Sequence, residues 1–112
     1  MHAYLIKSEK TITRQEGDCP APIVMIVPDV VDMLNYNVKF EVHNSSMRRI
    51  ISKSTEAGTV TVDGQTITIP LTEADTKGRP GKHKWEIQFY NNTPEIITAG
   101  RGPFVVTNEN IK

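Results

Sequence analysis

The stretch Gly58–Pro70, GTVTVDGQTITIP, constrains the fold of this chain more than any other. Two short runs alternate threonine with valine or isoleucine, and Asp63-Gly64 lies between them. This pattern predicts a β-hairpin with a two-residue loop, because aspartate and glycine tolerate the positive φ angles of a type I′ turn. The expected cross-strand pairs are Val62 with Gln65, Thr61 with Thr66, Val60 with Ile67 and Thr59 with Thr68.

The two faces of this hairpin differ in chemistry. Successive side chains of a strand point to opposite faces, so the aliphatic residues share one face and the threonines share the other. The face expected to pack into the core carries Val60, Val62, Ile67 and Ile69. The other face, expected to be solvated or to meet a partner, carries Thr59, Thr61, Thr66 and Thr68.

Similar alternation recurs along the chain, with turn residues between the segments and almost no helical period. Such a rhythm is typical of an all-β sandwich or barrel. The continuous apolar run Ala21–Val27 is interpreted as a central strand covered on both faces. Gly100-Arg101-Gly102 is interpreted as the turn between the last two strands. The other strands are expected at Lys10–Gln15, Asn37–His43, Arg49–Ser54, Lys82–Tyr90, Glu95–Ala99 and Pro103–Thr107.

Two segments are expected to be other than strands. Val30–Asn37 has no clear period and is interpreted as a loop or short helical turn. Its apolar members, expected to pack against the core, are Met33, Leu34 and Tyr36. Leu71–Lys77 predicts one helical turn, with Thr72 and Asp75 at its start and Gly78 at its end. We therefore expect a single domain over residues 1–112, an immunoglobulin-like β-sandwich of about eight or nine strands with one short helical turn.

Charge and cysteine content argue against several classes of protein. Lysine plus arginine equals aspartate plus glutamate, at 13 each, so we expect no nucleic-acid or anionic-membrane partner. No apolar run approaches the length of a membrane span. The single cysteine, Cys19, has no partner for an internal disulfide, and MHAYLIKSEK does not resemble a signal peptide. Synthesis in the cytoplasm is expected.

No group of residues predicts catalysis. The candidate metal ligands or nucleophiles lack the spacing of a ligand set, and they are Asp18, Cys19, His43 and His83. The carboxylates at Glu73, Asp75, Glu86 and Glu95 are spread over three expected elements, and no glycine-rich phosphate loop occurs. We expect a non-enzymatic protein without a metal site or cofactor.

The residues expected to contact partners are therefore exposed ones. Besides the threonine face, Lys77–Lys84 forms a basic cluster, interpreted as a solvated loop or as a docking patch for an acidic partner. Its cations are Lys77, Arg79, Lys82 and Lys84. Tyr4, Leu5 and Ile6 are expected to add a strand to a neighbour's sheet edge, or to pair with the last strand of the domain itself. Carbohydrate binding through Tyr4, Tyr36 and Tyr90 is an alternative, although these tyrosines do not form a stripe.

The order of the motifs over nearly the whole chain resembles the small immunoglobulin-like domains of tailed-phage and prophage virions, as in the N-terminal domain of baseplate upper proteins. The stretches that carry the resemblance are ITRQEGDCP, DMLNYNVKFEV, the long segment from the hairpin through KHKWEIQF, and ITAGRGPFVV. The matching residues are Asp32, Leu34, Tyr36, Phe40, Val42, Leu71, Thr72, Thr76, Gly81, Trp85, Ile87, Gly102, Phe104 and Val106. Cys19 departs from the pattern, which usually has a hydroxyl residue there.

The resemblance implies a non-enzymatic virion structural protein, made in the cytoplasm of a bacterial host. It would belong to the baseplate, the tail accessories, or a fibre or decoration of the head. Its partners would be other virion proteins, which it would contact as a homo-oligomer or in several copies arranged by the symmetry of the particle. The alternative function is a carbohydrate-binding module that contributes to attachment to the host surface.

Overall fold

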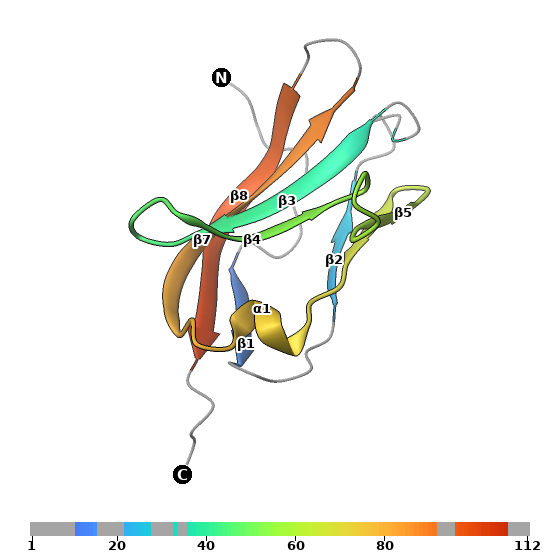
Figure 1. Cartoon of the computed structure of the whole chain (residues 1–112). Coiled ribbons are helices and arrows are strands. Elements are labelled where there is room, and N and C mark those ends of the chain that lie inside the picture. The colour runs from blue at the N-terminus through green and yellow to red at the C-terminus, as the bar shows by residue number, and fades with distance from the viewer. Residues whose placement is uncertain (1–10, 16–21, 28–32, 34–35, 92–95, 108–112) are drawn as a thin grey trace.

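The computed structural model describes residues 11–15, 22–27, 33, 36–91 and 96–107 (Figure 1). Its strands are β1 (Ile12–Gln15), β2 (Ile23–Ile26), β3 (Asn37–His43), β4 (Arg49–Ser54), β5 (Thr61–Asp63), β6 (Thr66–Ile69), β7 (Gly81–Tyr90) and β8 (Ile96–Thr107), and the helical turn α1 is Glu73–Thr76. One sheet has the order β1-β8-β7-β3-β4, and the other has the order β2-β6-β5. Only the pairing of β1 with β8 is parallel among these described strands. The fold is the predicted all-β immunoglobulin-like sandwich.

The core lies between the two sheets. The inward residues of β3 and β7 alternate with outward ones, as predicted, because only one face of each strand is covered. Phe40 of β3 and Trp85 of β7 stack, with ring centroids 6.1 Å apart and ring planes at 25°. His83, expected on the same face as Trp85, is only half-buried. The largest fully buried side chains are Phe40, Phe89, Phe104, Ile12, Ile23, Met25, Ile67, Ile69 and Ile87.

The helical turn at Leu71–Lys77 and the core contacts expected of Met33 and Tyr36 are confirmed. Met33 is buried, and Tyr36 packs against the core with its ring 6.1 Å from that of Phe89, while Leu34 lies outside the described residues. At the start of α1, the backbone N–H of Thr72 donates to Asp75 Oδ2 at 2.7 Å. Gly78, with φ of 75°, follows the helical turn.

The hairpin forms, but its two-residue loop lies one residue later in the sequence than predicted, so the predicted cross-strand register is wrong. Thr61 pairs with Thr68 and Asp63 with Thr66, so the two loop residues are Gly64 and Gln65. Only Gly64 has a positive φ, of 62°, which matches the requirement of a type II′ turn rather than type I′. Gln65 is held at the turn because its carbonyl accepts the N–H of Val27 at 2.8 Å. The shift moves each partner by two residues, so the aliphatic and threonine faces stay as predicted.

Gly64→Val is expected to lower the free energy of unfolding by about 1–2 kcal/mol, because a β-branched residue is strained at a positive φ. Gly64→Asn is the matched control, since asparagine tolerates this conformation, and it should cost clearly less. Urea denaturation of both variants checks the prediction. Equal losses for the two variants would contradict the assigned turn.

The interpretation of Ala21–Val27 as a central strand covered on both faces is wrong. β2 lies at an edge of the smaller described sheet and pairs only with β6. Its burial alternates, and Val24 and Ile26 are 48% and 54% exposed. A continuous apolar run in the sequence therefore forms a strand with one buried face and one exposed face.

The predicted turn at Gly100-Arg101-Gly102 is also wrong, because β8 continues through it as one strand. Gly100 pairs with Ile87 and Gly102 with Trp85 across the sheet. Glycines opposite these two large inward side chains leave room for them in the core. The register shifts next to Ile87, which is consistent with a β-bulge that bends the strand.

Candidate docking surfaces

The outward face of the smaller sheet is nearly free of charge. The register places Val24 beside Thr68, which in turn lies beside Thr61. It places Ile26 beside Thr66, which in turn lies beside Asp63. Asp63 is the only charged residue in these rows. The result is a patch of methyl and hydroxyl groups, which we call the threonine–aliphatic face and define as Val24, Ile26, Thr61, Thr66 and Thr68.

β2 also presents an edge of the sheet on this patch. The N–H of Val27 bonds to Gln65, so Met25 and Ile23 occupy the hydrogen-bonded positions of the ladder with β6. The backbone groups of Val24 and Ile26 therefore point away from β6. Among the described residues no strand pairs with this edge, so it has the properties of a site for strand addition.

The outward face of the larger sheet has the opposite character. Arg49 Nη1 lies 3.0 Å from Glu41 Oε2, and Arg101 Nη2 lies 3.4 Å from Glu86 Oε2. His43 Nε2 is 3.8 Å from the other oxygen of Glu41. A partner on this face would have to remove water from several charged groups, which is costly unless each is matched.

The structure places the predicted docking residues in different surroundings. Thr61, Thr66 and Thr68 lie on the threonine–aliphatic face, but Thr59 lies outside β5. Its hydroxyl accepts the N–H of Ser54 at 2.9 Å and donates to the Ser54 carbonyl at 3.2 Å, so Thr59 stabilises the β4–β5 connection. The segment Tyr4–Ile6 lies outside the described residues.

The basic cluster of the sequence is divided in the structure. Lys77 is exposed after α1, and Arg79 is half-buried, with its carbonyl oxygen 2.8 Å from His83 Nε2. Because a carbonyl oxygen can only accept, His83 Nε2 carries a proton and donates it in this contact. The other ring nitrogen, Nδ1, is buried and has no hydrogen-bond partner among the described residues. Lys82 and Lys84 line one cavity together, and Lys77 and Arg79 are not part of its lining.

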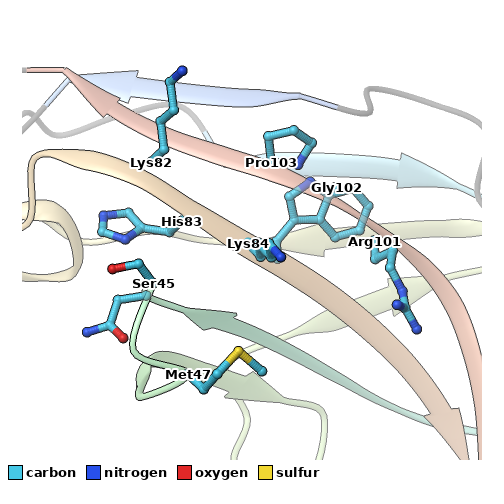
Figure 2. Close-up of a pocket in the computed structure, with 10 residues that line it drawn as sticks. Ser45, Met47, Lys82, His83, Lys84, Arg101, Gly102 and Pro103 are labelled. Atoms are coloured by element: carbon cyan, nitrogen blue, oxygen red, sulfur yellow. The ribbon is translucent and has the colours of Figure 1, made fainter.

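That cavity has a volume of about 510 Å³ and is formed by three segments that are distant in sequence (Figure 2). We call it the β7–β8 groove. Its lining comes from the β3–β4 loop, the first half of β7 and the middle of β8. The lining residues are Asn44, Ser45, Met47, Lys82, His83, Lys84, Trp85, Arg101, Gly102 and Pro103. The sequence did not indicate Met47 or Arg101, because nothing in their local patterns links them to Lys82.

Tyr36 and Tyr90, the two described tyrosines that were considered for sugar binding, do not share a face. Tyr36 packs on Phe89, which points into the core, whereas Tyr90 lines a small cavity of about 240 Å³ with Lys39, Ser54, Glu56 and Gln88. The Tyr90 hydroxyl donates to the carboxylate of Glu56. Desolvation, together with this hydrogen bond and the charge of Glu56, raises the pKa of Tyr90 to about 12. Tyr4 lies outside the described residues.

The described residues also bear on metal binding and on membrane insertion. No group of three or more His, Cys, Asp and Glu side chains gathers in the described part of the chain as metal ligands would. Cys19 and Asp18 are not among the residues described. Within the described ranges, no helix has the length and apolar character needed to cross a membrane.

Comparison with known proteins gives a likeness of fold only. No family model matches the chain, and no curated protein matches it significantly. Similar solved structures include the first immunoglobulin domain of the mouse polymeric immunoglobulin receptor, with a TM-score of 0.45, 16% identity, and coverage of 98% of this chain and 100% of that one. The periplasmic chaperone SfaE has a TM-score of 0.46, 10% identity, and coverage of 92% of this chain and 57% of that one. Extracellular domains 3–5 of Drosophila OTK have a TM-score of 0.39, 12% identity, and coverage of 88% and 33%.

Proposed function

We propose that this protein is a non-enzymatic docking module of a phage or prophage virion, which contacts other virion proteins through the threonine–aliphatic face. The observation that carries the proposal is the pair of exposed aliphatic side chains, Val24 and Ile26, on an edge strand within an almost uncharged patch. Apolar groups exposed together on a sheet face are typical of surfaces that meet another protein. The assignment to a virion comes from the resemblance of the sequence motifs.

The contrast between the two sheets supports the choice of face. Docking on the threonine–aliphatic face removes water mainly from methyl groups and hydroxyls. Docking on the larger sheet would desolvate the pairs Glu41–Arg49 and Glu86–Arg101. The uncharged face therefore gives the larger net gain per unit of area covered.

The size of the face favours attachment of the protein in several copies, as the resemblance of the sequence motifs also implies. Three strands spaced by about 4.8 Å, each about 13 Å long, present roughly 200 Å². A stable interface covers about 800 Å² on each partner. A single contact of this size is weak, so copies held on a symmetric partner would gain affinity by binding together.

The substitution Val24→Thr/Ile26→Thr tests the proposal, since it keeps β-branched residues in the strand but removes the apolar surface. We expect it to weaken binding to a virion protein encoded beside this gene by about tenfold, measured by biolayer interferometry. Ser52→Thr, on the outward face of the larger sheet, is the control and should bind as the wild type does.

Three outcomes would count against the proposal. The first is equal weakening by both variants, and the second is a gene neighbourhood of metabolic enzymes without tail or capsid genes. The third is saturable binding of host-wall glycans with a defined stoichiometry, which would favour the carbohydrate-binding alternative.

A further inference from the structure

The β7–β8 groove carries an excess of positive charge. Three of its ten lining residues are cations, Lys82, Lys84 and Arg101, and none is acidic. Arg101 pairs with Glu86, but no carboxylate among the described residues lies within ion-pair distance of Lys82 or Lys84. The two lysines are two residues apart on β7, so both point to the same face of the sheet. Their Cα atoms are about 7 Å apart. In a chain of zero net charge, this local excess selects for an anionic partner.

The same groove has an apolar wall. Met47 is 73% exposed, the largest exposed fraction among the big apolar side chains described. Pro103 lies across the groove on β8, directly beside Lys84 in the register. Methionine adapts its shape to different apolar partners because its side chain is unbranched and polarisable. The lining therefore combines two lysines with an adaptable apolar contact (Figure 2).

The loop that presents Met47 is held in place by its own hydrogen bonds. Asn44 Oδ1 accepts the N–H groups of Ser46 and Arg48, at 2.9 Å and 3.0 Å. The N–H of Met47 donates to the Asn44 carbonyl at 2.9 Å. Met47 has a φ of 64°, a conformation that costs a non-glycine residue energy and that this network sustains. A loop fixed before binding loses less entropy when a ligand arrives.

We propose that the β7–β8 groove binds an acidic segment of a partner protein, with carboxylates at Lys82 and Lys84 and an apolar side chain of the segment against Met47 and Pro103. A nucleic acid fits less well, because Trp85 is buried and His83 is half-buried, so the lining offers no fully exposed ring for base stacking. The site extends the docking function to a second surface, and it does not require the threonine–aliphatic face.

The test uses a fluorescein-labelled 12-residue peptide of aspartate and glutamate with one central leucine, and it measures fluorescence anisotropy at low ionic strength. Lys82→Gln/Lys84→Gln should weaken binding at least tenfold. Lys39→Gln/Lys77→Gln removes the same charge away from the groove and should change binding less than twofold. Thermal unfolding monitored by circular dichroism establishes that each variant is folded.

The apolar contact is tested separately. Met47→Ser should weaken the leucine peptide several-fold but leave a matched peptide with glycine in place of leucine unaffected. Equal losses in the two lysine pairs would overturn the proposal in favour of general charge attraction, and so would equal binding of a single-stranded DNA 12-mer. Val24→Thr/Ile26→Thr should leave peptide binding unchanged, so the failure of one docking surface is distinguishable from the failure of the other.

Discussion

Phe40→Ala is expected to lower the free energy of unfolding by about 3–5 kcal/mol, the largest effect of any substitution considered. Phe40 is fully buried on β3, which pairs with both β4 and β7. Its ring stacks on Trp85, so truncation removes an aromatic contact as well as buried area and leaves a cavity between the sheets. Because a domain of this size is typically stable by about 5–15 kcal/mol, the variant would retain only part of its folded population under mild denaturation.

Urea denaturation followed by tryptophan fluorescence measures this effect directly, since Trp85 is the only tryptophan. Phe40→Leu is the matched control because it keeps most of the volume, and it should cost about 1–1.5 kcal/mol. An alanine variant that loses less than about 1 kcal/mol would show that Phe40 is not part of the packed core.

Asp75→Asn is expected to cost about 2 kcal/mol at neutral pH. Lys53 Nζ lies 2.8 Å from Asp75 Oδ2, and the two side chains are only 11% and 18% exposed. The same carboxylate accepts the Thr72 N–H, so the substitution weakens a partly buried ion pair and the start of α1 together. Asp75→Asn/Lys53→Met, which removes both charges, should recover part of the loss because no unpaired ammonium group remains.

The pH dependence of stability gives a second measurement of the same pair. Burial on its own would raise the pKa of Asp75, but the hydrogen bonds from Lys53 and Thr72 and the charge of Lys53 outweigh it, and the pKa lies below its ordinary value of 3.8. A carboxyl with a lowered pKa stabilises the folded state fully above pH 3.8 and loses this contribution as the pH falls through its folded pKa. The stability difference between wild type and Asp75→Asn should therefore shrink below pH 3.8, and a constant difference down to pH 2 would contradict this account.

Alternation in the sequence predicted the strands whose two faces meet different surroundings. β3 and β7 were placed within one residue because polar and apolar side chains take turns along them. The prediction that β2 is covered on both faces is wrong because its outward residues, Val24 and Ile26, are as apolar as its inward ones. Sequence pattern reports the chemistry of a side chain, and it does not report whether the domain itself covers it.

The misread parts of β8 and of the candidate sites have a common physical cause. Glycine is frequent in turns, so Gly100 and Gly102 predict a loop from the sequence alone. Only the register of the sheet shows that they lie opposite Ile87 and Trp85 within one strand. The β7–β8 groove joins the β3–β4 loop to two later strands, and only the register of the sheet brings them together. The lysines were predicted as a possible acidic-partner patch, but the exposed methionine beside them was not.

The position of β8 has a consequence for how the polypeptide acquires its shape. β1 and β7 both depend on β8, which separates them in the sheet and runs to residue 107. Ile12 pairs with Phe104, a contact between positions near opposite ends of the chain. Long-range pairings of this kind slow folding to the millisecond-to-second range. On the ribosome, the five-stranded layer therefore assembles only after translation has passed its last strand, and until then the inward aliphatic side chains of the earlier strands are without the β8 neighbours that complete this layer.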